Sequence, residues 1–183
     1  MKVFICGSVD QRINPIYLEG IDKIAENLAE NNDGVMLVGA QTGSIGAMYK
    51  GMTDRNARVD IIVPTPYADE AEGMVANSIT KVDTLFLLQQ IALRNTEATI
   101  VLPGGNGTLA ELYMITDSIK SRFDTDKVLI YNINGFYNHL KDMNDFMMEA
   151  GVLKQDQYEF FTWCDTYEDI IRELNAVRKD YAK

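Results

Sequence analysis

The residues best suited to chemistry lie in a glycine-rich segment at residues 103–111, with the sequence PGGNGTLAE. It follows the apolar run 98–102 and precedes a helical pattern, so we expect a turn between a buried strand and a helix. Glycines let the main chain approach a ligand closely, and a helix start presents unpaired N–H groups and partial positive charge. These features predict an anion site, most naturally for a phosphate, with one more hydrogen bond from the Thr108 hydroxyl.

Three other interpretations of this segment are a turn without a ligand, a Walker P-loop and a dinucleotide-binding loop. A tight turn without any ligand is one alternative. A Walker P-loop is excluded because no Gly-Lys-Ser/Thr sequence ends the segment. Residues 105–110 match the loose dinucleotide pattern, but that fingerprint belongs in the first strand–helix turn of a fold, and this segment lies deep in the chain.

Glu111 lies about one helical turn beyond the glycines, so its carboxylate can stand beside whatever the segment binds. A surface salt bridge is the simplest alternative role. The functional interpretation places the carboxylate beside the sugar of a bound nucleotide. There it could stabilise an oxocarbenium-like transition state or orient a water molecule, as carboxylates do in glycoside cleavage.

The elements that must position this segment alternate between strand and helix patterns along the whole chain. We expect strands at residues 2–6, 35–38, 59–63, 79–82, 98–102, 128–131 and 158–163. We expect helices at residues 15–28, 44–54, 84–95, 108–120, 136–147 and 167–177. This alternation predicts one α/β domain over residues 1–183, with a Rossmann-like, doubly wound and mostly parallel sheet flanked by helices. Ligands of such sheets bind beyond the carboxyl ends of the strands, that is, near residues 7–8, 39–46, 64–69 and 103–108.

Composition and charge restrict the possible partners. The 183 residues carry 17 Lys+Arg against 27 Asp+Glu, a net charge of -10, which would repel a phosphate backbone and disfavours a nucleic-acid partner. Cys6 and Cys164 lie in apolar stretches without zinc spacing, so we expect buried reduced thiols and a reducing cytoplasm. With His139 as the only histidine, no metal site, catalytic Ser-His-Asp triad or cofactor is expected, and no stretch is long enough to span a membrane.

The segment 103–111 resembles the PGGxGTxxE signature of the LOG family, the "Lonely guy" phosphoribohydrolases, whose members are often misnamed lysine decarboxylases. Further similarities are co-linear with it: residues 5–8 with Tyr17, the loop 39–46, residues 63–64, and the segment 127–140. The resemblance implies a Rossmann-like fold, usually dimeric, that hydrolyses the N-glycosidic bond of nucleoside 5′-monophosphates to free base and ribose 5-phosphate. It implies that Glu111 is catalytic. The expected phosphate- or nucleotide-binding residues are Gly7, Ser8, Gly39, Gly43, Gly104, Gly105, Asn106, Gly107, Thr108 and Thr116.

The chain departs from the family at its second catalytic residue, an arginine. Its spacing from the motif proline puts it at Leu88, followed by Gln89, so this arginine is missing. The nearest candidate is Arg94, for which a solvated position at a helix end is the alternative role. Three hypotheses follow. Arg94 or a glutamine takes the place of the missing arginine, a partner chain supplies the cation, or the protein binds its ligand without turnover.

Two functions follow as the main hypotheses. The first is a hydrolase acting on an AMP-like nucleoside monophosphate. The alternative is a non-catalytic carrier or sensor of a nucleotide or a phosphorylated cofactor such as molybdopterin, and a DNA-processing relative of similar fold conflicts with the negative charge. The helix at residues 84–95 is apolar on nearly all sides, which predicts a homodimer because large apolar patches mark interfaces.

Overall fold

The computed structural model describes residues 1–120 and 127–181, and these residues contain one sheet of seven strands. The strands are β1 (Lys2–Cys6), β2 (Gly34–Leu37), β3 (Val59–Pro64), β4 (Ser78–Val82), β5 (Ala98–Val101), β6 (Lys127–Tyr131) and β7 (Phe161–Cys164). Their order across the sheet is β4-β3-β2-β1-β5-β6-β7, and every neighbouring pair is parallel. The predicted doubly wound sheet is therefore confirmed.

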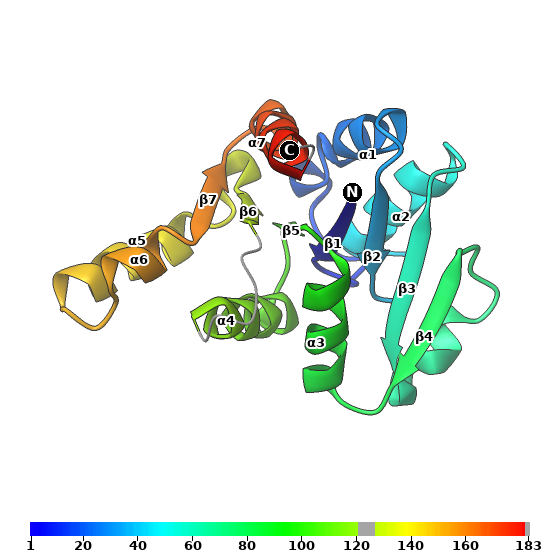
Figure 1. The fold of residues 1–183 in the computed structure, drawn as a ribbon, viewed down its shortest axis with the longest axis horizontal. Helices are drawn as coiled ribbons and strands as arrows, with labels where there is room; N and C mark the ends of the chain where they lie inside the picture. Colours follow the sequence, from blue (N-terminus) through cyan, green and yellow to red (C-terminus); the bar gives the residue numbers. More distant parts are fainter. Residues whose placement is uncertain (121–126, 182–183) are drawn as a thin grey trace.

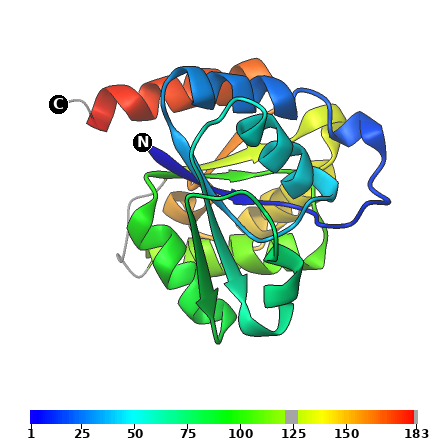
Figure 2. The same ribbon diagram turned by 90° about the vertical axis from the view of Figure 1, so that its right-hand side faces the viewer.

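Helices cover both faces of this sheet, which explains why the central strands are mostly apolar rather than alternating between apolar and polar residues. One face carries α1 (Ile21–Glu30), α2 (Gly43–Thr53) and α7 (Tyr167–Tyr181), and the other carries α3 (Leu85–Asn95) and α4 (Asn106–Lys120) (Figures 1 and 2). The remaining helices, α5 (Asn138–Glu149) and α6 (Gln155–Tyr158), lie on the side of β6 and β7 (Figure 1). Alternate residues of β1 serve the two cores: Val3 and Ile5 face α1 and α2, while Phe4 and Cys6 face α3 and α4.

The strand order reverses between β1 and β5. From β1 the chain winds outward through β2, β3 and β4, then returns to place β5 on the other side of β1. Val3 accordingly pairs with Val35 of β2 on one side and with Ala98 of β5 on the other. The loops that leave β1 and β5 diverge at such a reversal and open a crevice, which is where doubly wound sheets bind ligands.

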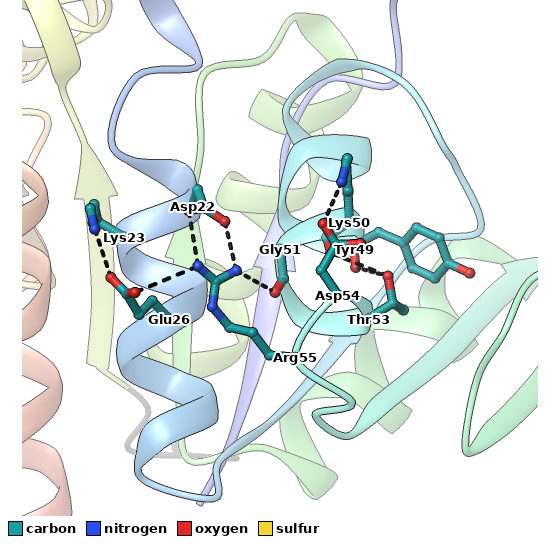
Figure 3. Close-up of polar contacts among 9 residues, drawn as sticks. All are labelled: Asp22, Lys23, Glu26, Tyr49, Lys50, Gly51, Thr53, Asp54 and Arg55. Carbon is teal, nitrogen blue, oxygen red and sulfur yellow. Dashed lines mark hydrogen bonds and ion pairs between the residues drawn. The ribbon is translucent and has the colours of Figure 1, made fainter.

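Helices α1 and α2 pack closely side by side, and one arginine ties them together (Figure 3). Arg55 donates from Nη1 to Asp22 Oδ1 (2.7 Å) and to the Gly51 carbonyl oxygen (2.8 Å), and from Nη2 to Asp22 Oδ2 (3.0 Å). A Cβ added at Gly51 would lie 2.7 Å from the Ala25 Cβ atom, so glycine is required for this approach. This contact fixes α2, whose N-terminal end borders the crevice.

The helix predicted over residues 15–28 is divided in the structure. Pro15–Tyr17 forms a 3₁₀ turn capped by the Asn14 side chain, and α1 begins only at Ile21. Gly20 separates the two with a left-handed φ of 75°, and a Cβ there would lie 2.4 Å from the Tyr131 hydroxyl oxygen. The prediction was wrong here because the apolar spacing continues through a position where the chain must turn tightly against Tyr131.

Two later boundaries also differ from the prediction. The strand expected at residues 158–163 is shorter, because Tyr158 ends α6 and β7 covers Phe161–Cys164. The helix expected from residue 136 begins at Asn138, since Asn132 Oδ1 accepts a hydrogen bond from Tyr137 N (2.7 Å) and closes a turn first. Within the described ranges, no helix has the length and apolar character needed to cross a bilayer.

Candidate functional site

A cleft of about 430 Å³ opens at the carboxyl edge of the sheet, over the point where the strand order reverses. Its size falls within the roughly 300–1,000 Å³ typical of small-molecule sites. The walls come from residues 7–10 after β1, 38–39 after β2 and 63–64 at the end of β3, and from Tyr67, Glu70, Leu85, Leu88, Gly105, Gly107, Thr108, Ala110, Glu111 and Met114. All four loops that were expected to surround a ligand, including the glycine-rich segment, thus contribute to the cleft wall.

The start of α4 forms the polar end of the cleft. The first hydrogen bond of the helix runs from Leu109 N to Gly105 O (3.0 Å), so the amides of Asn106, Gly107 and Thr108 precede the bonded turns. Gly105 and Gly107 both line the cleft, and a Cβ added to either would meet no atom within 4 Å. Packing does not require glycine at these two positions. Their effect is to leave the backbone bare toward the cleft, as an anion cradle needs.

Gly104 has a different role from its neighbours. A Cβ at this position would lie 2.1 Å from Thr108 Oγ1 and 2.9 Å from Ser8 N. Next to it, the Tyr137 hydroxyl donates to Leu102 O (2.7 Å). Gly104, one of the expected phosphate-binding residues, does not line the cleft. It shapes the loop that carries the cradle.

Ser44, at the start of α2, joins the loops that leave β1 and β5. Its hydroxyl accepts from Ser8 N (2.8 Å) and donates to Pro103 O (2.8 Å), and the side chain is fully buried. A Cβ at Gly7 would lie 2.5 Å from Ser44 Oγ. Gly43 has a φ of 70°, and a Cβ there would lie 2.2 Å from Ser8 O. Of these glycines, Gly7 lines the cleft, whereas Gly43 does not line it and lies against the backbone of Ser8.

Sequence reasoning did not assign Ser44 a role. Only its place after Gly43, in a loop that follows a strand, could have indicated it. Gly39 lines the cleft as expected, and a Cβ at this position would lie 2.6 Å from the Ala71 Cβ atom. Asn106 and Thr116 do not line the cleft, and the Thr116 hydroxyl donates to Tyr113 O (2.9 Å) within α4.

Glu111 lies half-buried on the wall of the cleft, one turn after the cradle. Burial raises its pKa to about 7, and the neighbouring Cys6 thiol lowers it in part. Cys6 itself is fully buried at the end of β1, and burial together with the Glu111 carboxylate raises its pKa well above the usual range, so the thiol keeps its proton. A surface salt bridge would lower the pKa of Glu111 instead. A carboxyl that titrates near pH 7 can exchange protons with a substrate or a water molecule, as general acid–base catalysis needs.

The charged residues of the cleft wall are Asp10, Glu70 and Glu111, and among the described residues no lysine or arginine lines it. Leu88 lies on the wall at the position where the family arginine would stand. Gln89 next to it is only 3% exposed and does not line the cleft, and its Oε1 atom has no hydrogen-bond partner in the described part of the chain. Gln89 therefore does not take the place of the arginine in the cleft.

Arg94 does not line the cleft. Leu85 and Leu88 of α3 do, and Arg94 follows Leu88 by six residues, about 9 Å along the helix axis at 1.5 Å per residue. It is exposed in the last turn of α3, which leads back toward the start of β5. The structure thus does not bring Arg94 and Glu111 of one chain together. His139 is also exposed, on α5, and is not part of the cleft wall.

Comparisons with known proteins agree with this geometry. A cytokinin riboside 5′-monophosphate phosphoribohydrolase of Arabidopsis thaliana is 23% identical over 174 residues, which cover 94% of this chain and 76% of that protein. The molybdenum cofactor carrier protein of Chlamydomonas reinhardtii superposes with a TM-score of 0.68 at 12% identity, covering 97% of this chain and 98% of that one. The molybdenum cofactor binding protein of Rippkaea orientalis gives a TM-score of 0.67 at 13% identity, covering 96% and 94%. At such identities the two solved structures show a shared fold alone.

A family model described as "Possible lysine decarboxylase" matches residues 29–174, most of the chain. The matched part includes β2 to β7 and contains both the cradle at the start of α4 and Glu111. The chain therefore belongs to this family, the LOG family that its motifs resemble.

Proposed function

We propose that the protein hydrolyses the N-glycosidic bond of a nucleoside 5′-monophosphate, releasing the free base and ribose 5-phosphate. The observation that carries the proposal is the placement of Glu111, with its raised pKa, one helical turn from a bare-backbone anion cradle in the same cleft. A phosphate bound at the cradle would leave the sugar near Glu111. The geometry thus favours chemistry at the sugar over chemistry at the phosphate.

In the proposed reaction, the bond between C1′ and the base nitrogen breaks and a water oxygen bonds to C1′. The ionised Glu111 carboxylate stabilises the positive charge that develops on the sugar and accepts a proton from the attacking water. The departing base takes up one proton, so the overall reaction consumes one water molecule. A pKa near 7 lets the same carboxyl accept this proton and release it again at neutral pH.

The far end of the cleft fits a base. Val38, Val63, Leu88 and Met114 line it with apolar surface, against which a flat heteroaromatic ring can pack. Small-molecule sites commonly combine such apolar walls with a few placed polar groups. The expected ligand is therefore an AMP-like nucleotide rather than a sugar phosphate alone.

A homodimer is part of this proposal. Leu85, Phe86 and Leu87, in the first turn of α3, are 53%, 74% and 40% exposed. Three consecutive exposed apolar side chains at the mouth of a cleft favour burial against a second copy of the chain. With a net charge of -10, the surface favours a small ligand over nucleic acid, and we expect the protein to act in the cytoplasm.

The second candidate is a carrier or sensor that binds a nucleotide or phosphorylated cofactor without cleaving it. The specific observation in its favour is Leu88, which replaces the family arginine on the cleft wall. Loss of one preorganised charged group typically costs on the order of 10²–10³ in rate, which could reduce a hydrolase to a binder.

One experiment separates the two candidates. Purified protein is incubated with AMP and with other nucleoside monophosphates at pH 7, and free base and ribose 5-phosphate are measured. We expect release from at least one of them by the wild-type protein, and a loss of 10²-fold or more in the Glu111→Gln variant. Micromolar binding without any release would establish the carrier, and neither binding nor release would refute both candidates.

A further inference from the structure

Among the residues that the structure describes, none places a positive side chain on the cleft wall to balance the charge of a phosphate ligand. Asp10, Glu70 and Glu111 are acidic, and the described part of the cleft wall contributes no lysine or arginine. Backbone amides at the start of α4 supply only partial charge, equivalent to about half an elementary charge. A doubly charged phosphate ester beside three carboxylates calls for a full cation nearby.

Arg12 is placed to supply that cation. It follows β1 on the loop that forms one wall of the cleft, and its guanidinium pairs with Asp10, itself a wall residue. Arg12 Nε lies 3.0 Å from Asp10 Oδ1 and 3.2 Å from Oδ2, and Arg12 N donates to Oδ1 (2.9 Å). These bonds keep Asp10 ionised, because they lower its pKa to about 2.

The loop that carries this pair lies directly beside the cradle. Ser8 N donates to Pro103 O (3.2 Å), and Ser8 Oγ accepts from Asp10 N (3.0 Å). A Cβ on Gly104 would lie 2.9 Å from Ser8 N, so the loop leaving β1 touches the loop leaving β5 at the start of α4. The loop that carries the Asp10–Arg12 pair thus contacts the loop that precedes the cradle.

The guanidinium is also free to change partners. The Arg12 side chain is 85% exposed, and within the described residues its bonds are with Asp10. An exposed ion pair of this kind contributes little to stability and exchanges readily. A planar guanidinium can form a bidentate bond with a phosphate as well as with a carboxylate.

We propose that Arg12 binds the phosphate group of the ligand by exchanging its bond with Asp10, and so supplies the positive charge that the described cleft wall does not contain. This inference rests on the proposed nucleotide site. In the ligand-free state Asp10 holds the guanidinium at the edge of the cleft. When the phosphate enters the cradle, Arg12 turns to it and the Asp10 carboxylate is released to solvent.

The test measures binding of AMP and of adenosine by calorimetry, in the Glu111→Gln background so that AMP is not consumed. Arg12→Ala should weaken AMP binding by about 10-fold, the low end expected for a charge-assisted hydrogen bond at an exposed site, and change adenosine binding by less than about twofold. Arg172→Ala is the matched control, because Arg172 is also exposed and pairs with an aspartate, Asp169, on α7 away from the cleft. It should leave AMP affinity unchanged.

A double variant, Asp10→Asn with Arg12→Ala, separates direct contact from charge masking. If Arg12 touches the phosphate, the double variant stays about as weak as Arg12→Ala. Recovery to the parent affinity would mean that Arg12 only screens Asp10, and equal AMP affinity in Arg12→Ala and Arg172→Ala would mean that it does neither; each result overturns the inference. If the parent protein binds no AMP at all, the proposed function itself fails, which is a distinguishable outcome.

Discussion

The raised pKa of Glu111 should make the stability of the ligand-free protein depend on pH in a defined direction. The pKa rises from its ordinary value of 4.5 to about 7 because burial in the fold disfavours the ionised form. Between pH 4.5 and 7 the folded state therefore holds a proton that the unfolded chain has released. Stability falls as the pH rises through this interval, and the cost is fully present above pH 7.

The size of this effect follows from the two pKa values. At about 1.4 kcal/mol per pH unit, the ionised Glu111 costs at most about 3 kcal/mol above pH 7. Glu111→Gln keeps the shape of the side chain and removes the titration. We expect it to raise the free energy of unfolding by about 1–3 kcal/mol at pH 8, and by clearly less at pH 5. In a chain of this length that is a shift in Tm of roughly 3–9 °C.

The assay is thermal or urea unfolding of wild type and variant at several values between pH 4.5 and 8, without ligand. Glu149→Gln is the matched control, because it removes a carboxylate that is exposed at the end of α5. The difference between Glu111→Gln and wild type should grow with pH, and that of the control should not. Equal pH profiles for the two variants would refute the claim that the fold desolvates Glu111.

Three further outcomes are expected. Gly107→Val should lower AMP affinity at least 10-fold by calorimetry with an unchanged Tm, because the valine side chain fills the open cleft. Gly104→Ala should instead lower Tm, because its Cβ meets Thr108. The reverse pattern would contradict these separate roles of the two glycines. Phe86→Glu should shift the protein from dimer to monomer in light scattering with its helical CD intact, and a wild-type monomer at micromolar concentration would remove the predicted dimer. Ser44→Ala should cost about 1–3 kcal/mol in urea unfolding, because it removes both hydrogen bonds of a buried hydroxyl. A cost near zero would show that the two loops do not depend on Ser44.

The parallel sheet and the glycine-rich turn at the start of α4 were predictable from sequence, because local patterns specify both. Residues 98–101 are apolar except for Thr99 and are buried at every position, as expected of a strand covered on both faces, and the glycines after them mark a helix start. The placement of Glu111 beside the cradle followed from helix geometry alone. Local spacing was enough wherever the relevant neighbours were close in sequence.

The features that escaped prediction depend on partners distant in sequence. Gly20 interrupts an apolar helical pattern because the chain turns there against the side chain of Tyr131, which lies in β6. Gly104 looks like the other loop glycines, yet a Cβ there would lie 2.9 Å from Ser8 N, in the loop that leaves β1. The pairing of Asp10 with Arg12 is local, but its position on the cleft wall became visible only once β1 and β5 were placed side by side.

The position of the phosphate and the sugar in a bound nucleotide tests the central claim most directly. A crystal structure of the Glu111→Gln variant with AMP should place the phosphate within hydrogen-bond distance of the Gly107 and Thr108 amides, with C1′ of the ribose facing residue 111. A phosphate bound elsewhere, or a sugar turned away from that side chain, would contradict the assignment of this cleft as the site of glycosidic cleavage.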